Sequence, residues 1–277
     1  MPDFASPLLE STVAGTLRAA GCVFAEDEAR LLIAAARTPD DLAAMVERRA
    51  SGLPLEHVVG WAEFCSLRIA VDPGVFVPRR RTEFLVRRAV AHAGAVPRSG
   101  GTGRPGAART VVLDLCCGSG AVGVALASAL DAVELYAADL DPAAVRCARR
   151  NVRPFGGSVH EGDLFAPLPE QLCGRVALLA ANVPYVPTDS VGFLPPEARD
   201  HEARIALDGG PDGLDVLRRV AERAASWLAP GGALFFETSE DQAPVAVGIV
   251  RAGGLEPEVA TDDDLGATVV TGTRPRV

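Results

Sequence analysis

From Thr110 onward, short apolar segments alternate with helix-type segments, and this alternation constrains the fold more than any other feature of the chain. The apolar segments predict strands near residues 110–115, 133–138, 157–161, 175–181 and 231–237, with a final pair near 255–260 and 267–273. The segments between them predict helices near residues 120–130, 142–151, 212–229 and 241–252. Strand–helix alternation of this kind builds an α/β fold with a mostly parallel, doubly wound sheet.

The residues before this alternation predict a smaller helical domain. Apolar side chains recur at helical spacing from Leu8 to Leu17 and again around Leu31. Pro39, followed by two aspartates, is typical of a third helix start. We therefore divide the chain into an N-terminal helical domain at residues 1–55, a β-hairpin linker at 56–81 and a main domain at 82–277.

The linker is expected to form a hairpin between the two domains. Its first strand is expected at residues 64–71, its turn at the Pro-Gly pair of residues 72–75, and its second strand at residues 75–77. Thr82 follows and is placed to cap a helix. Residues 93–109 are rich in Gly, Pro, Arg and Ala without apolar periodicity, and this is typical of a flexible surface insertion.

Composition argues against several functional classes. The net charge of −9 argues against a broad phosphate-binding surface and therefore against a nucleic-acid substrate. Apolar stretches fall short of the ~18 residues of a membrane span, and the first residues lack the pattern of a signal peptide. The six cysteines form no Cys-x-x-Cys pair and have no His at ligand spacing. We therefore expect a reduced, cytoplasmic protein without a metal site.

A glycine loop follows the first strand of the alternating region. Gly118, Gly120 and Gly123 allow a tight turn and the close approach of a ligand to the backbone. Their spacing also satisfies the dinucleotide fingerprint, so a nicotinamide oxidoreductase is one interpretation. Asp114 argues against it, because a carboxylate at the end of this strand suits a cationic amino-acid group better than a pyrophosphate. Cys117 also lengthens the loop.

Acidic residues end two further strands of the predicted sheet. Asp139 follows the second strand and is placed to accept hydrogen bonds from both ribose hydroxyls of a nucleoside. Asp163 follows the third strand, where it could accept from an adenine amino group while Leu164 covers the ring. Each acid alone is often a cap or turn residue, as we expect for Asp141. Three acids at the ends of successive strands, with a glycine loop, favour a nucleoside pocket.

The tetrapeptide Asn182-Val183-Pro184-Tyr185 ends the fourth strand. Its proline prevents the strand from continuing in the sheet, so the chain leaves at the edge where open α/β folds bind ligands. The Asn182 side chain and the Val183 backbone each offer a carbonyl oxygen to an incoming N–H. Tyr185 offers a flat face to a planar amide or base. Alone, the tetrapeptide would also fit an ordinary Asn-Pro turn.

Together these residues resemble the S-adenosylmethionine-dependent methyltransferases with a seven-stranded, Rossmann-like sheet. Further segments resemble the release-factor glutamine methyltransferases within that class: residues 73–79, 82–83, 206–215 and 228–232, and Glu237. The resemblance extends from about residue 52 to the end of the chain. Three features depart from the family pattern: Val183 replaces a proline, two cysteines replace a glycine and a small polar residue in the loop, and the N-terminal domain is shorter.

The resemblance implies S-adenosylmethionine as cofactor and a release factor, or another glutamine-containing protein, as partner. The implied cofactor-binding residues are Asp114, Cys116, Cys117, Gly118, Gly120, Asp139, Leu140, Asp163, Leu164 and Asn182. The implied substrate-binding residues are Arg79, Thr82, Glu83 and Tyr185. Methyl transfer is implied at Asn182, Val183, Pro184 and Tyr185.

The implied reaction is direct methyl transfer to an amide nitrogen. That nitrogen is a weak nucleophile because its lone pair is delocalised, and two acceptors at Asn182 and Val183 would orient it toward the methyl group. We assign no general base. The alternatives are methylation of an exocyclic amine on a nucleic acid, methylation of a small molecule, and, given Val183, a non-catalytic docking protein that keeps only the nucleoside pocket.

Overall fold

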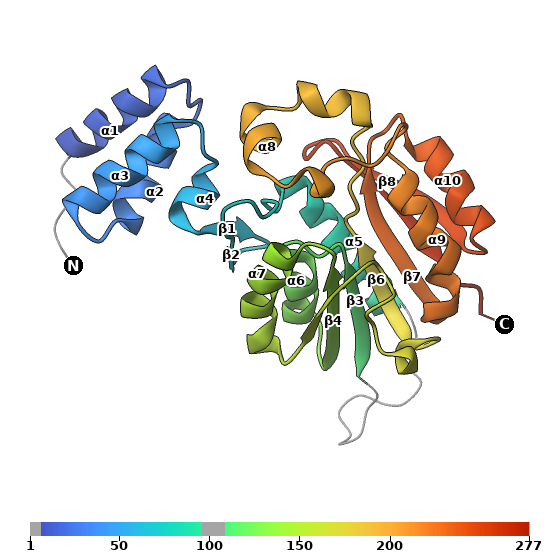
Figure 1. Ribbon diagram of the computed structural model, residues 1–277. Helices are drawn as coiled ribbons and strands as arrows, with labels where there is room; N and C mark the ends of the chain where they lie inside the picture. The colour runs from blue at the N-terminus through green and yellow to red at the C-terminus, as the bar shows by residue number, and fades with distance from the viewer. Residues whose placement is uncertain (1–6, 96–108, 277) are drawn as a thin grey trace.

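A computed structural model of the protein describes residues 7–95 and 109–276 (Figure 1). Its main element is a seven-stranded sheet in the order β5–β4–β3–β6–β7–β9–β8. The strands are β3 Thr110–Leu115, β4 Val133–Asp139, β5 Ser158–Glu161, β6 Val176–Ala181, β7 Leu228–Thr238, β8 Glu256–Asp262 and β9 Ala267–Thr273. Strands β3 to β7 pair in parallel, whereas β9 is antiparallel to both of its neighbours. The expected mostly parallel, doubly wound sheet is confirmed.

Helices cover both faces of this sheet because its strands are apolar on both sides. The covering helices are α5 Glu83–Ala95, α6 Ala121–Ala129, α7 Pro142–Val152, α9 Asp215–Trp227 and α10 Ala243–Ala252. Successive residues of β3 point to opposite faces of the sheet and so pack against different helices. Val112 packs with α5 and α6, while Leu113 and Leu115 pack with α9 and α10. This burial leaves the loops at the carboxyl ends of the strands free to form a site.

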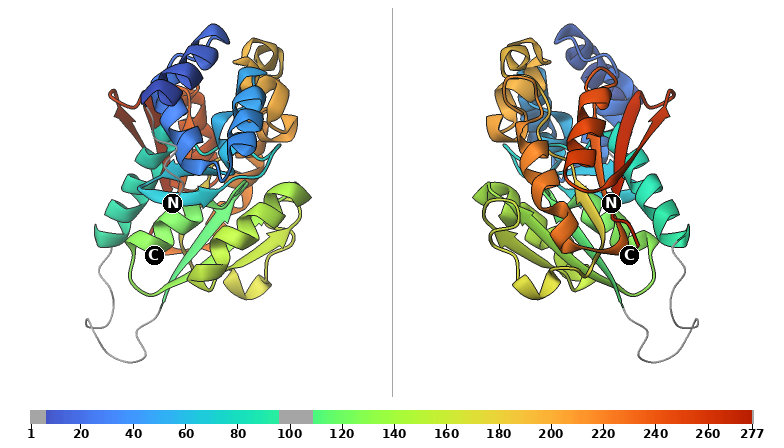
Figure 2. Two further views of the ribbon diagram at one scale, coloured as in Figure 1. Left: turned by 90° about the vertical axis from the view of Figure 1, so that its left-hand side faces the viewer. Right: turned by 90° about the vertical axis from the view of Figure 1, so that its right-hand side faces the viewer.

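Four helices precede the sheet and pack around their own apolar cluster. They are α1 Pro7–Ala19, α2 Ala25–Ala35, α3 Pro39–Ala50 and α4 Leu55–Val59, with Leu17, Ala29 and Leu32 at the centre. The predicted start of α3 is correct: Thr38 accepts from the Asp41 N–H at 3.1 Å. Helix α4 was not expected. Arg49 of α3 pairs with Glu197 of α8, Pro196–His201, at 2.7 Å, and Figure 2 views the two elements from either side.

The predicted hairpin exists, but its turn lies elsewhere. Strands β1 Trp61–Phe64 and β2 Leu67–Ala70 pair antiparallel. Their turn is Cys65-Ser66, with φ of 50° and 59°, the conformation of a two-residue hairpin turn that usually selects Gly or Asn. The predicted turn at residues 72–75 is present, since the Val75 N–H donates to the Asp72 carbonyl oxygen at 3.1 Å, but it does not join the strands of the hairpin. The second strand expected at residues 75–77 is wrong, although Val75 and Val77 are buried against α7.

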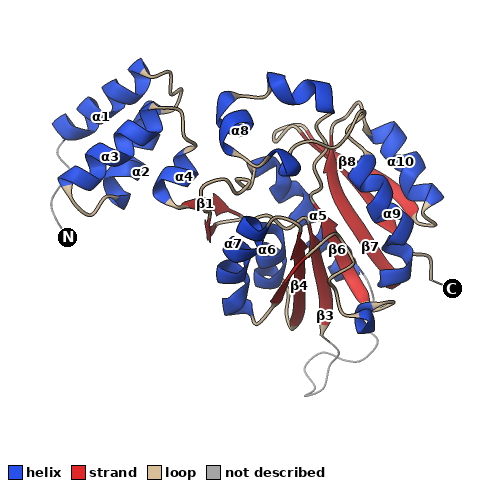
Figure 3. Ribbon diagram, in the orientation of Figure 1, coloured by secondary structure: helices blue, strands red, loops and turns tan. Residues whose placement is uncertain are grey.

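Two further expectations concern the segments around the main domain. Helix α5 continues to Ala95, so residues 93–95 of the expected insertion are helical, and residues 96–108 of it lie outside the described residues. Between β6 and α9 the chain forms short helical turns, η4 Thr188–Phe193, α8 and η5 Arg204–Ala206, above the sheet (Figure 3). We call this segment, residues 186–214, the roof. Within residues 7–95 and 109–276, no helix is long and apolar enough to cross a bilayer.

Candidate active site

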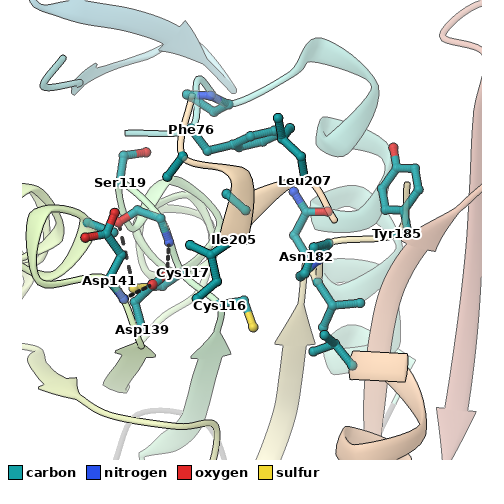
Figure 4. Close-up of a pocket in the computed structure, with 18 of the residues that line it drawn as sticks. Phe76, Cys116, Cys117, Ser119, Asp139, Asp141, Asn182, Tyr185, Ile205 and Leu207 are labelled. Carbon is teal, nitrogen blue, oxygen red and sulfur yellow. Dashed lines mark hydrogen bonds between the residues drawn. The ribbon is translucent and has the colours of Figure 1, made fainter. Parts of the chain in front are cut away.

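A cavity of about 500 Å³ lies at the carboxyl ends of the parallel strands, beneath the roof (Figure 4). Its walls come from the loops after β3, β4, β5 and β6, from the linker, and from the roof. The predicted site residues that line it are Arg79, Thr82, Asp114, Cys116, Cys117, Gly118, Asp139, Leu140, Asp163, Leu164, Asn182, Val183, Pro184 and Tyr185. Gly120 and Glu83 are not among the lining residues.

The glycine loop lines the cavity from Cys116 to Val122 except at Gly120. Cys116 has a φ of 51° and lines the cavity together with Cys117. Burial raises the pKa of both thiols, so they are neutral side chains. Gly120, with a φ of 78°, lies behind the loop, where an added Cβ would come within 3.1 Å of Val152. Gly120 thus allows the loop to pack against α7 rather than to contact a ligand.

Asp114 presents a buried carboxylate oxygen without a partner. Its side chain is 1% exposed, and Oδ2 accepts from the Gly123 N–H at 2.8 Å. Oδ1 is buried and has no hydrogen-bond partner among the described residues. Burial, opposed by the Gly123 hydrogen bond, raises the pKa of Asp114 to about 8. A buried, unsatisfied acceptor beside a cavity fits a cationic ligand group, because pairing relieves the cost of desolvation.

Asp139 is held in place by the backbone of its neighbours. Oδ2 accepts from the Gly118 N–H at 2.8 Å and Oδ1 from the Asp141 N–H at 2.9 Å. Each oxygen keeps acceptor capacity, so the carboxylate can still receive two hydroxyl groups from a ligand. Burial raises its pKa, and these two N–H groups oppose the rise. Asp141 caps α7 as expected, accepting from the Ala143 N–H at 2.8 Å.

Asp163 follows β5 and forms an ion pair with Arg219 of α9. Both side chains are about half exposed, so the pair adds little stability. Leu164 adopts a φ of 48°, which is uncommon for a leucine. Both residues line the cavity. The contact with Arg219 leaves one Asp163 oxygen for a ligand donor.

Asn182 stands directly after β6 with its amide turned into the cavity, between Ile205 and Tyr185 in the close-up (Figure 4). The described residues include no hydrogen-bond partner for this amide, so its oxygen is available to a ligand N–H. Val183 is 2% exposed and packs into the core below the cavity. Its side chain therefore points inward, while the tetrapeptide backbone borders the cavity.

All four residues predicted to bind substrate make hydrogen bonds within the protein itself, and for Tyr185 the hydroxyl donates to Glu237 at 2.7 Å. Arg79 pairs with the fully buried Glu202 carboxylate, with N–O distances of 2.6 and 2.7 Å. Thr82 donates to Glu237 at 2.7 Å rather than capping α5. Glu83 accepts from the Cys65 N–H at 3.0 Å, away from the cavity.

Sequence reasoning missed the apolar side of the cavity. Phe76 from the linker and Leu194, Ile205 and Leu207 from the roof line it. Ile205 is 52% exposed and lines the cavity, so its side chain is accessible to an apolar surface of a ligand. The Leu-Asp-Gly-Gly segment of the roof was noted as a motif, but a local pattern does not reveal which side chains fold back over the sheet.

Part of the cavity wall lies in a region of the chain that matches a known family. The family described as Methyltransferase small domain matches residues 104–184. This range contains the glycine loop, the three acids and the first part of the tetrapeptide, and it ends at Pro184.

Similar curated proteins cover most of the chain. A release factor glutamine methyltransferase of Geobacter sulfurreducens is 38% identical over 85% of this chain and 79% of its own length. One of Mycolicibacterium smegmatis is 37% identical over 86% and 82%. A 4-amino-L-phenylalanine/4-methylamino-L-phenylalanine methyltransferase of Streptomyces pristinaespiralis is 38% identical over 76% and 69%. The matched relatives are therefore methyltransferases named for methyl acceptors of two chemical kinds.

Proposed function

Because this chain belongs to the release factor glutamine methyltransferase family, we propose that it transfers a methyl group from S-adenosylmethionine to a glutamine side-chain amide of a release factor. The observation that carries the proposal is the composition of one cavity. It is lined both by Asp114, whose Oδ1 has no partner, and by Asn182, whose amide is free to accept an N–H. A cation-binding end and an amide-binding end thus share one space.

The acids of the cavity suit the polar groups of the cofactor. Asp114 would pair with the ammonium group, Asp139 would accept from the ribose hydroxyls, and Asp163 would accept from the adenine amino group while Leu164 covers the ring. When bound, S-adenosylmethionine supplies an electrophilic methyl group on a sulfonium sulfur. The apolar side chains of the roof exclude water from the same space.

The tetrapeptide would hold the acceptor amide. The Asn182 side-chain oxygen and the Val183 backbone oxygen accept its two N–H groups, and Tyr185 offers its ring face to the amide plane. This arrangement turns the nitrogen lone pair toward the methyl group and favours the positive charge that develops on nitrogen. No residue is required to remove a proton before transfer: the S–methyl bond breaks as the N–methyl bond forms, the sulfonium leaves as a neutral thioether, and the methylated nitrogen then loses one N–H proton to solvent.

A second candidate acceptor is an aromatic amine on a small molecule. The relative from Streptomyces pristinaespiralis, named for that chemistry, has the same 38% identity to this chain as the Geobacter sulfurreducens enzyme, over 76% rather than 85% of the chain. Its amine nitrogen, like an amide nitrogen, is conjugated and offers two N–H groups. Direct comparison of a Gly-Gly-Gln release-factor peptide with 4-amino-L-phenylalanine as acceptors discriminates between the two.

Replacing Asn182 tests the proposal for either acceptor. Asn182→Ala should lower methyl transfer by about two to three orders of magnitude, as expected for the loss of one preorganised transition-state hydrogen bond. Its affinity for S-adenosylmethionine, measured by calorimetry, should change little and serves as the internal control, because the proposal assigns the Asn182 amide to the acceptor and the main cofactor contacts to the three aspartates. Full transfer activity in Asn182→Ala would contradict the assignment of this residue.

We also propose distinct roles for the parts of the chain. Residues 82–277 form the catalytic domain, residues 56–81 the linker, and residues 1–55 a domain that docks the protein substrate or stabilises the roof. The contact between Arg49 of α3 and Glu197 of α8, at 2.7 Å, supports the second role. All six cysteines are free thiols, which suits a reducing compartment such as the cytoplasm.

A further inference from the structure

Glu237 is a buried carboxylate at the end of β7 that joins three segments of the chain. Its side chain is 2% exposed. Oε1 accepts from Arg81 Nε and from the Tyr185 hydroxyl, both at 2.7 Å, and Oε2 accepts from the Thr82 hydroxyl at 2.7 Å. The linker, the end of β6 and the end of β7 therefore meet at one group.

The Tyr185 hydroxyl is fully engaged by this arrangement. It donates to Glu237 and accepts from Arg81 Nη2 at 2.7 Å. Burial and the negative charge of Glu237 raise the pKa of Tyr185, while Arg81 opposes the rise. The phenol thus has no proton to give to a reacting group, and only its ring is available in the cavity.

The Tyr185 backbone is fixed from the other side. Its carbonyl oxygen accepts from Gln242 Nε2 at 2.9 Å. Arg81 also lies over the ring, 5.9 Å from its centroid. The ring is therefore held at both ends, beside Asn182, and Glu237 is the anchor at the hydroxyl end.

We propose that Glu237 is a positioning residue for the methyl acceptor and that it acts through the Tyr185 ring. The inference rests on the proposed function, since it assumes that an acceptor amide or aromatic amine lies against Tyr185. Misplacement of a reacting group by about 1 Å can cost ~100-fold in rate, so an anchor outside the contact surface can affect turnover strongly.

Two conservative variants distinguish the effect of the position of the Glu237 carboxylate from the effect of its charge. Glu237→Gln removes the charge but keeps an oxygen for Arg81 and Tyr185 and a polar atom for Thr82, whose hydroxyl can also accept. Glu237→Asp keeps the charge but withdraws the carboxylate by one methylene. A positioning role predicts that Glu237→Gln retains kcat within about threefold, whereas Glu237→Asp loses about 10- to 100-fold in kcat. Both should bind S-adenosylmethionine within about twofold of the wild type.

A double-variant cycle tests whether the effect passes through Tyr185. Tyr185→Phe removes the anchored hydroxyl, and Tyr185→Phe combined with Glu237→Asp should be no slower than the more impaired single variant. Multiplied losses in the double variant would overturn the inference, because Glu237 would then act independently of Tyr185. The opposite ranking of the two glutamate variants, with Gln slower than Asp, would also overturn it.

A spectroscopic measurement separates this inference from the proposed function. The chain has two tyrosines, so ¹³C-tyrosine labelling gives resonances that a Tyr136→Phe variant assigns. Tyr136 also donates to a carboxylate, Glu134, at 2.6 Å, and is the internal control. Glu237→Asp should shift the Tyr185 resonance and leave Tyr136 unchanged. An unchanged Tyr185 resonance would overturn the inference alone, whereas a shift in a protein that methylates neither acceptor supports the anchoring and defeats the proposed function.

Discussion

Replacing Asp114 with asparagine should stabilise the empty protein while weakening its binding of S-adenosylmethionine. The Asp114 side chain is buried, and only Oδ2 has a hydrogen-bond partner. Burial raises its pKa to about 8, compared with about 3.9 for an aspartate in an unfolded chain. An ionised carboxylate is therefore disfavoured at this position of the folded protein.

These two pKa values set the size of the effect. At pH 7 the unfolded chain has lost this proton while the folded protein retains it, which lowers the stability by about 4 kcal/mol as an upper limit. Asparagine removes this titration and keeps an oxygen for the Gly123 N–H, but its NH₂ group stays buried without a partner, at a cost of about 1–3 kcal/mol. We therefore expect Asp114→Asn to raise the free energy of unfolding at pH 7 by about 1–3 kcal/mol.

The pH dependence has a defined sign. Because the pKa of Asp114 is raised in the folded state, its contribution to stability is most favourable below about pH 4 and is lost as the pH rises toward 8. The stability advantage of Asp114→Asn should therefore grow by about 1.4 kcal/mol per unit between about pH 5 and 7. Urea unfolding across this range measures it, and Asp131→Asn, at an exposed position, controls for the loss of a negative charge.

Ligand binding should change in the opposite direction. A ligand ammonium favours the ionised form of Asp114, so binding at pH 7 should release about one proton. Calorimetry in two buffers of different ionisation enthalpy counts that proton. Asp114→Asn should weaken binding by about 1.5–3 kcal/mol, the range for a hydrogen bond to a charged group. A variant less stable than the wild type at every pH, or binding without proton release, would refute the reasoning.

Substitutions at three other sites should change ligand affinity, activity or stability in a defined direction. Asp139→Ala should weaken S-adenosylmethionine binding by about 1.5–3 kcal/mol in calorimetry, with NADH showing no binding to either protein. Val183→Pro should preserve or raise activity on a Gly-Gly-Gln peptide in a transfer assay; its loss there would indicate another acceptor. Arg49→Ala leaves the buried Glu28 carboxylate without its partner and should lower the free energy of unfolding by about 3–5 kcal/mol. Glu197→Ala removes only the exposed partner of Arg49 and should lower it by about 0–1 kcal/mol.

The alternation of strands and helices could be predicted because burial leaves a simple trace in the sequence. A parallel strand covered on both faces is a continuous apolar run, as in β3 and β6, and the expected bounds of these strands differ from those of the structure by at most one residue. The linker hairpin was misplaced because its turn, Cys65-Ser66, adopts left-handed conformations without glycine or asparagine. The nearby Pro-Gly pair carries the stronger local turn signal but forms no hairpin.

The acids of the site were predictable for a topological reason, whereas their partners were not. Parallel strands bring their carboxyl ends to one edge, so Asp114, Asp139 and Asp163 line a common cavity. The contacts of Arg79 with Glu202 and of Thr82 with Glu237 join residues more than 100 positions apart. A local pattern therefore shows an arginine run and a threonine without the carboxylates that engage them.

Packing and a hydrogen bond restrain the tetrapeptide at Val183, where the family resemblance implies a proline. Proline would restrict the backbone through its ring, and valine lacks that restriction. The Val183 side chain is instead buried in the cluster that contains Leu115 and Leu214, so packing limits its freedom. Gln242, bound to the Tyr185 carbonyl at 2.9 Å, holds the other end of the tetrapeptide. Because packing and this hydrogen bond act on both sides of Pro184, we expect the proposed acceptor oxygens to keep their position without a second proline.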